Sequence, residues 1–90
     1  MRVKFFANLR DYTGCSEIDI AAPGTVNDLV RLLSDRYGPR LRDKMLDPEG
    51  GLGPELIIMI NGRHVLHLGG LDAPLKDDDT LQIFTMVAGG

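Results

Sequence analysis

The last four residues, Val87-Ala88-Gly89-Gly90, are the part of this sequence whose residue types and position best suit a chemical role. They complete an apolar, strand-like run that begins at Leu81, which would hold the base of the tail on a rigid body. Glycine has no Cβ, so the final residues can enter a narrow channel and adopt backbone angles that other residues avoid. Four extended residues reach at most about 14 Å. We expect a flexible Gly-Gly tail that delivers the carboxylate of Gly90 into another protein's active site, against the alternative of an incidental frayed terminus.

Three other groups of potentially reactive side chains are weaker candidates. Cys15 has no histidine near it in the sequence, and we interpret it as a free structural or surface cysteine rather than a catalytic thiol. His64 and His67 lie three residues apart in a predicted strand, which would point them to opposite faces and prevent a shared metal. The acidic run at residues 77–79 lacks the further ligands of a magnesium site and is predicted to be a solvated turn.

Length and composition limit the classes of protein to consider. Ninety residues predict one domain over residues 1–90, and 43% hydrophobic with 26% charged residues is ordinary for a soluble protein. The longest apolar run, residues 56–60, is far too short to span a bilayer. A formal net charge of −3 argues against a nucleic-acid partner, and a single cysteine fits a reducing compartment. We therefore expect a cytoplasmic protein that binds neither membrane nor nucleic acid.

The charge is unevenly distributed along the chain. Residues 1–45 hold eight Lys or Arg against six Asp or Glu, whereas residues 46–90 hold two against seven. The acidic half suits a partner with a basic docking surface, although it could equally serve solubility alone. A small basic cluster is interpreted as a solvated face and consists of Arg36, Arg40, Arg42 and Lys44.

Hydrophobic periodicity predicts the elements that must position the tail. Alternation over residues 2–9 predicts a strand, followed by a turn at residues 11–14 and a second strand at residues 17–20. Thr25 and Asp28 form a capping-box pattern at the start of a helix that Gly38-Pro39 ends. Its buried stripe is predicted to be Val26, Leu29, Val30, Leu33 and Tyr37. A short second helix is expected around residues 40–46.

The second half of the chain is predicted to be rich in strands. Asn61-Gly62 separates two strand-like runs, residues 56–60 and 63–68, and is a strong signal for a tight hairpin. A last strand is predicted over residues 81–87. The order β-β-α-β-β-β predicts an α+β fold, a mixed sheet of about five strands with one main helix packed on one face.

This element order, the Asn61-Gly62 hairpin, the segment 71–79 and the terminal Val-Ala-Gly-Gly together resemble the ubiquitin-like sulfur carriers, and among them the small subunit of molybdopterin synthase. The resemblance covers essentially the whole chain and implies a β-grasp fold. It also implies that an E1-like adenylating enzyme uses Mg-ATP to convert the Gly90 carboxylate into an acyl-adenylate. A persulfide sulfur would then attack the carbonyl and leave a thiocarboxylate on Gly90, which the large subunit of molybdopterin synthase would use to place sulfur in a pterin precursor.

The same resemblance makes this chain a non-catalytic carrier that binds no cofactor or metal itself. Residues 50–53 are glycine-rich but lack the Lys-Ser/Thr and strand-to-helix context of a phosphate-binding loop. Three alternatives stay open: a sulfur carrier for thiamine, cysteine or tungsten-cofactor synthesis, a ubiquitin-like modifier joined through Gly90 to a lysine, and a plain interaction domain with an incidental tail.

Alternation in the last strand predicts a docking surface beside the tail. If Leu81 and Ile83 face the helix, Phe84 and Met86 face away from it. In the family fold the first and last strands are neighbours, which would bring Phe6 into the same apolar patch, extended by Ile57 or Met59. The residues predicted to bind partners are Phe6, Phe84, Met86, Val87, Ala88 and Gly89. The alternative is that strand twist or the loop 47–55 covers the patch.

Overall fold

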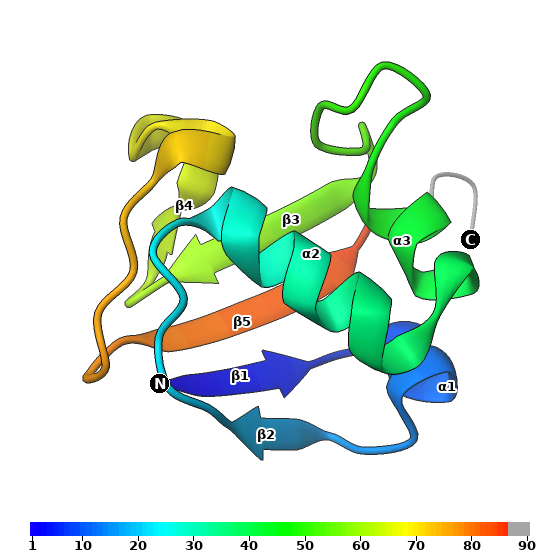
Figure 1. The fold of residues 1–90 in the computed structure, drawn as a ribbon, viewed down its shortest axis with the longest axis horizontal. Coiled ribbons are helices and arrows are strands. Elements are labelled where there is room, and N and C mark those ends of the chain that lie inside the picture. The colour runs from blue at the N-terminus through cyan, green and yellow to red at the C-terminus, as the bar shows by residue number, and fades with distance from the viewer. Residues whose placement is uncertain (87–90) are drawn as a thin grey trace.

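A computed structural model describes residues 1–86 of the chain. Its helices and strands follow one another along the chain as β1 (Arg2–Phe5), α1 (Leu9–Thr13), β2 (Glu17–Asp19), α2 (Val26–Tyr37), α3 (Pro39–Met45), β3 (Leu56–Ile60), β4 (Arg63–His64) and β5 (Thr80–Thr85) (Figure 1). Two short 3₁₀ turns, Val65–His67 and Gly70–Asp72, lie between β4 and β5.

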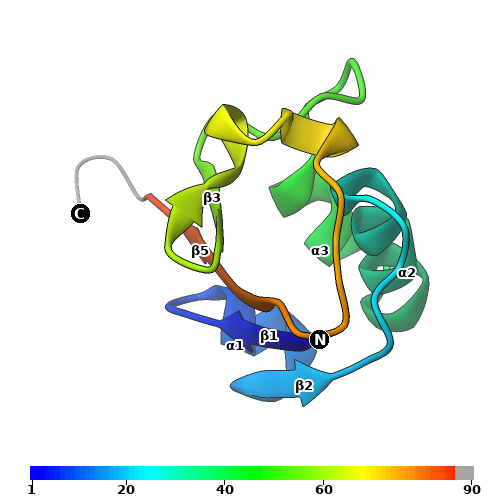
Figure 2. The same ribbon diagram turned by 90° about the vertical axis from the view of Figure 1, so that its left-hand side faces the viewer.

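The five strands form one mixed sheet in the order β2-β1-β5-β3-β4. β1 pairs with β5 in parallel, and the other pairs are antiparallel. Helices α2 and α3 lie on one face of this sheet, and Figure 2 shows them together on its right-hand side. The predicted α+β architecture, a mixed five-stranded sheet with a main helix on one face, is confirmed.

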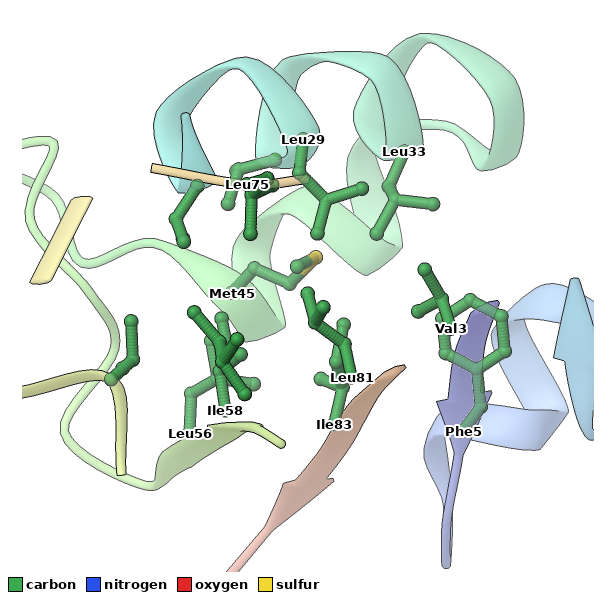
Figure 3. Close-up of a cluster of buried hydrophobic side chains, with 14 of the residues drawn as sticks. Val3, Phe5, Leu29, Leu33, Met45, Leu56, Ile58, Leu75, Leu81 and Ile83 are labelled. Atoms are coloured by element: carbon green, nitrogen blue, oxygen red, sulfur yellow. The ribbon is translucent and has the colours of Figure 1, made fainter. Parts of the chain in front are cut away.

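The core fills the space between the sheet and these two helices. Val3, Leu81, Ile83 and Ile58 project from three adjacent strands and are fully buried, and the helices cover them with residues such as Leu33 (Figure 3). The strand residues lie at every second position, which is why alternate side chains of each strand reach the same face. Alternate side chains of β5 therefore face the core on one side of the sheet and the outer face on the other.

Helix α2 begins and ends where its sequence predicts. The Thr25 Oγ1 atom accepts a hydrogen bond from the Asp28 amide at 3.3 Å, and the Thr25 amide donates to the Asp28 carboxylate at 3.1 Å, completing a capping box. Gly38 ends the helix with a φ of 96°, a left-handed conformation that glycine adopts without strain. Pro39 then starts α3, whose Leu41 and Met45 side chains are buried, as expected for the short second helix.

The predicted first strand is too long, because the chain turns after Phe5. Ala7 has a φ of 53°, and the helix α1 occupies the place of the predicted turn at residues 11–14. Leu9 is fully buried, but from α1 rather than from a strand. The apolar residues at positions 3, 5 and 9 fit the alternation of a single strand. In the structure, Val3 and Phe5 belong to β1 and Leu9 belongs to α1.

The predicted strand over residues 63–68 is also wrong beyond His64. β4 has two residues, and the chain then enters the 3₁₀ turn Val65–His67. Val65 is 1% exposed while Leu66 is 65% exposed. The turn lets Val65 reach the core at the edge of the sheet, and this packing overrides the strand preference of the run.

Candidate functional site

β5 is the central strand of the sheet and the element that carries the predicted tail. It pairs with β1 on one side and β3 on the other over its length. Leu81 and Ile83 are fully buried, whereas Gln82 and Phe84 on the opposite side are only half-buried. Being hydrogen-bonded on both edges and packed from one face, β5 is held more firmly than either edge strand.

Two hydrogen bonds fix the end of β5. The Met86 amide donates to the Glu55 carbonyl at 2.7 Å, and the Thr85 hydroxyl donates to the Asn8 side-chain oxygen at 2.7 Å. The second bond ties β5 to the start of α1 across 77 positions of sequence. These bonds hold the backbone in place as far as Met86, so the position of Met86 fixes where the tail begins.

The predicted tail residues Val87, Ala88, Gly89 and Gly90 lie outside the described residues. Their roles as partner-binding segment and carrier position stay predictions. The predicted strand over residues 81–87 corresponds to β5, Thr80–Thr85, within the part of the chain that the structure describes.

The outer face of the sheet carries an aromatic pair next to the end of β5, in which Phe6 is exposed and Phe84 is half-buried. The rings of Phe6 and Phe84 are 6.3 Å apart between centroids and stand nearly perpendicular, at 86°. This edge-to-face arrangement is favourable for two aromatic rings. Phe6 is 39% exposed, although most of its neighbours along β1 are buried or half-buried. We call Phe6, Phe84 and Met86 the outer apolar patch.

A hollow of about 390 Å³ lies against this patch, and its lining is mainly apolar. It is lined by Phe6, Ala7, Gln82, Phe84 and Thr85. The left-handed backbone at Ala7 turns the chain away just after Phe6 and leaves one wall of the hollow without a bulky side chain. An exposed, concave apolar surface of this kind is typical of a protein contact. Alternation with Leu81 and Ile83 places Gln82 on this outer face, whereas Ala7 and Thr85 carry no signal in the sequence that would have assigned them to the hollow.

The neighbouring strand β3 extends the same face. Ile57 lies directly opposite Phe84, and Met59 lies opposite Gln82, so all four side chains share the outer side of the sheet. Ile57 and Met59 are both half-buried. The register therefore places both residues on the outer face, where the sequence predicted one of them.

The loop 47–55 does not cover the patch. None of its residues lines the hollow at Phe6 and Phe84, and Met86 is 61% exposed. The alternative of a covered patch is therefore wrong for Phe6 and Met86, and these residues are free to meet another molecule. That they bind a partner stays a prediction.

The two histidines lie closer together than predicted. Because β4 ends at His64, the 3₁₀ turn brings the ring of His67 to 6.0 Å from that of His64, between centroids. The expectation that they point to opposite faces is wrong. The His64 Nδ1 atom accepts a hydrogen bond from the Leu66 amide at 3.1 Å, which gives this ring a role in capping the turn. Within residues 1–86, no group of three or more His, Cys, Asp or Glu side chains is arranged to hold a metal ion.

Cys15 is half-buried and its Sγ atom lies 3.7 Å from the Tyr37 hydroxyl. Burial raises the pKa of Tyr37, the hydrogen bond with Cys15 and the charge of its thiolate form raise it further, and the Arg36 guanidinium opposes the shift. The Arg36 guanidinium stands 5.5 Å from the centre of the Tyr37 ring. The thiol therefore packs against Tyr37 at the end of α2, and the interpretation of Cys15 as a structural or surface cysteine stays a prediction.

The acidic run before β5 is more structured than a solvated turn. Asp79 is 8% exposed and accepts hydrogen bonds from the Asn61 side chain and the Lys76 amide, both at 2.8 Å. Asp77 accepts from the Ala22 amide at 2.8 Å. These carboxylates hold the hairpin turn and the start of β5 in place, and the prediction of a solvated turn is wrong for Asp79.

Comparison with known proteins places this geometry in a family. The model of the ThiS family matches residues 3–90, nearly the whole chain. The chain belongs to the ThiS family of ubiquitin-like sulfur carriers. Among curated proteins, it is 33% identical to small archaeal modifier protein 3 of Haloferax volcanii over 92 residues, covering 100% of this chain and 98% of that protein.

Solved structures of ThiS-like proteins share the fold. The small archaeal modifier protein 1 of Methanosarcina acetivorans has a TM-score of 0.82 and 36% identity, covering 99% of this chain and 94% of that one. CysO of Amycolatopsis orientalis, solved in a complex with BexX, has a TM-score of 0.80 and 33% identity over 99% and 98% of the two chains. The predicted β-grasp fold and the sulfur-carrier family are thus confirmed. In residues 1–86 no helix is long and apolar enough to cross a lipid bilayer.

Proposed function

We propose that this ThiS-family chain carries sulfur as a thiocarboxylate on Gly90, and that the outer apolar patch docks it on the enzymes that load and unload the tail. The observation that carries the proposal is the junction at the end of β5. There the backbone is fixed by the Met86–Glu55 hydrogen bond, four residues before Gly90 and beside an exposed apolar hollow. A partner enzyme that binds Phe6 and Phe84 would thereby position the tail at the entrance of its own active site.

The chemistry of loading requires an activated carboxylate. An E1-like adenylating enzyme with Mg-ATP would form the Gly90 acyl-adenylate and release pyrophosphate. A persulfide on a partner would then displace AMP to give an acyl disulfide. A thiol would reduce the S–S bond of this intermediate, leaving the thiocarboxylate on Gly90 and a disulfide on the donor. This chain contributes the acyl group and the docking surface, while the enzyme supplies ATP and magnesium.

The destination that the sequence resemblance favours is molybdopterin synthesis, with this chain as the small subunit of molybdopterin synthase. In that role the loaded tail would enter the large subunit, and the thiocarboxylate sulfur would move to a pterin precursor while Gly90 returns to a carboxylate. The resemblance of residues 71–79 and of the terminal Val-Ala-Gly-Gly supports this destination.

A second candidate function is protein modification. Its support is that two ThiS-like relatives of 33% and 36% identity are named small archaeal modifier proteins. Here the ε-amine of a target lysine would attack the Gly90 adenylate, forming an isopeptide bond and releasing AMP. The same tail and the same activation step would serve both functions, so the acceptor alone separates them.

Intact mass spectrometry tests the loading step. The chain would be incubated with the E1-like enzyme, a persulfide donor and a thiol from its own organism, with Mg-ATP. We expect the mass gain of one oxygen replaced by sulfur, located on the C-terminal fragment. Deletion of Gly90 should abolish it, whereas Ala88→Gly, which leaves the terminal carboxylate in place, should retain it. Equal loading of the deletion variant would refute Gly90 as the carrier position.

The acceptor is then identified with the loaded protein. Incubation with the large subunit and the pterin precursor should return the mass of Gly90 to that of the carboxylate if molybdopterin synthesis is the destination. Lysine adducts on a denaturing gel, with the segment 77–90 left on the target lysine after trypsin cleavage at Lys76, would instead show a modifier. A loaded chain that keeps its sulfur with the large subunit would exclude the molybdopterin role and leave another carrier pathway.

A further inference from the structure

The surface of α2 and α3 is strongly basic, in contrast with the acidic chain as a whole. Five of the ten Lys and Arg residues fall within residues 31–44, together with only two acids, Asp35 and Asp43. All five are exposed: Arg31, Arg36, Arg40, Arg42 and Lys44. Among the described residues none of them forms an ion pair, since the ion pairs of residues 1–86 involve Met1, Arg2 and their partners in β2. The segment thus carries +3, and the rest of the chain −6.

A groove runs through this basic surface. It encloses about 290 Å³ between α2 and α3, and is lined by Val30, Arg31, Ser34, Asp35, Arg42 and Leu46. Half-buried Leu46 provides apolar contact area above the fully buried Val30, while each helix contributes one exposed arginine. The Ser34 hydroxyl donates to the Val30 carbonyl at 2.7 Å, so it is already engaged within α2.

We propose that this groove binds a short acidic segment of a partner protein, with an apolar side chain seated between the helices and carboxylates on Arg31 and Arg42. A guanidinium pairs with a carboxylate through two parallel hydrogen bonds, which suits an Asp or Glu side chain. The accessible apolar surface of Leu46 has no use in binding a phosphate backbone but suits a leucine or valine of a peptide. The distribution of charge on this chain also favours a protein segment.

The distribution of charge favours a short protein segment over a nucleic acid. The chain outside residues 31–44 carries a net −6, which disfavours a nucleic acid that extends beyond the groove, whereas a peptide of a few residues needs only the segment that carries +3. The potential of the groove would also speed the encounter with an acidic partner.

Helices α2 and α3 lie on one side of the sheet (Figure 2). The groove between them is therefore on the face opposite the outer apolar patch, which faces away from the helices. A segment bound between α2 and α3 therefore leaves Phe6, Phe84 and the end of β5 accessible. The inference goes beyond the sulfur-carrier function and does not depend on it: it adds a second contact surface, through which the chain could be held while its tail is loaded or unloaded.

An NMR titration of the full chain tests the proposal, with an acetylated peptide of alternating glutamate and leucine as the probe. We expect saturable shifts of the amides of Val30, Arg31, Arg42 and Leu46, and roughly tenfold weaker binding at high salt because the contact is largely ionic. A peptide of alternating lysine and leucine should leave these amides unchanged. Absence of shifts with the acidic peptide, or shifts spread over the sheet instead, would overturn the proposal.

Charge-matched variants separate the groove from the overall charge. Arg31→Glu/Arg42→Glu should weaken binding by at least about tenfold, and Arg63→Glu/Lys76→Glu, which changes the net charge equally at the far end of the sheet, should not. If the first pair does not fold, Arg31→Gln/Arg42→Gln serves in its place. An equal loss of affinity for the acidic peptide in the two double variants would overturn the proposal. So would an oligouridine that binds at the same amides more tightly than the acidic peptide, which would assign the surface to RNA.

Discussion

Two consecutive residues, Phe5 and Phe6, form aromatic pairs of nearly the same geometry on opposite sides of the sheet. Phe5 meets Tyr37 with ring centroids 6.1 Å apart at 83°, and Phe6 meets Phe84 at 6.3 Å and 86°. Phe5 is 2% exposed, but Phe6 is 39% exposed. The two pairs differ in what lies above them, because α2 and α3 cover only one face of the sheet.

The comparison shows that the same residue type is fully buried on one face of the sheet and only partly buried on the other. Burying a phenylalanine from water stabilises the folded state, and Phe5 has already made that contribution. Phe6 and Phe84 leave part of their apolar surface accessible, which makes them candidates for contact with another protein. Substitutions on the outer face should therefore separate binding from stability, whereas those on the inner face should not.

The largest expected effect is on the inner pair. Phe5→Ala should lower the free energy of unfolding by about 3–5 kcal/mol, since it removes a buried ring and leaves a cavity under α2. Urea denaturation measures this, with Phe6→Ala as the matched control one residue along the chain. We expect the control to lose less than about 1.5 kcal/mol. Similar losses for the two variants would break the distinction between the two faces.

The next effect is on binding by the outer apolar patch. Phe84→Asp should weaken the affinity for the E1-like enzyme by about tenfold or more, because a charge replaces an apolar anchor at the centre of the contact. The free energy of unfolding should fall by at most about 2.5 kcal/mol, from the strand preference and the loss of the aromatic pair with Phe6. Calorimetric titration and urea denaturation give the two numbers.

Leu66→Asp is the control for this substitution. It makes the same chemical change at an exposed apolar residue outside the patch, and Leu66 is 65% exposed. It should leave the affinity unchanged. If Phe84→Asp and Leu66→Asp bind the enzyme equally well, the outer apolar patch is not its docking surface.

A smaller effect concerns the aromatic pairs themselves. Double-mutant cycles with alanine at Phe6 and Phe84, and with leucine at Phe5 and Tyr37, should each give a coupling energy of about 0.5–1.5 kcal/mol. Their similar geometry predicts similar coupling, although their burial differs. If only the Phe6–Phe84 pair shows a coupling energy near zero, then burial of the rings by the helices, and not their relative geometry, determines the coupling energy.

The smallest effect depends on pH and applies to the inner pair only. The pKa of Tyr37 is raised above its usual 10.0, chiefly by burial, so the folded protein holds the phenol proton more tightly than the unfolded chain. This contribution to stability is complete below pH 10 and is lost as the pH rises through the raised pKa. The unfolding free energy should fall more steeply above pH 10 in the wild type than in Tyr37→Phe, measured by urea denaturation. Parallel curves would contradict the shift.

Much of the fold could be predicted from local patterns, because those patterns report contacts between residues close in sequence. The Thr25–Asp28 capping box, the stripe of α2 and the Asn61-Gly62 hairpin depend on neighbours within a few positions. Predictions failed where packing overrode the pattern. Residues 9–13 form a helix because the backbone turns at Ala7, and alanine is not a residue whose presence predicts a positive φ.

The candidate site divides in the same way. Alternation along β5 sufficed to place Phe84 on the side opposite Ile83, and the position of Gly89-Gly90 at the end of the sequence sufficed to propose a carrier. The hollow beside Phe6 could not be predicted, since it needs Ala7 and Thr85 from opposite ends of the chain.

By itself the sequence determined helix α2, the hairpin at Asn61-Gly62, the two sides of β5 and the Gly-Gly tail that follows it, since these depend on residue type and short spacing. The tertiary structure decided which apolar residues remain exposed, that Thr85 is bonded to Asn8, and that Arg31 and Arg42 border one groove. Those outcomes depend on strand register and on how the helices cover one face. Strand register and helix placement arise from contacts between segments distant in sequence. The entropy lost in closing the loops and the free energy gained from burial depend on how the whole chain packs.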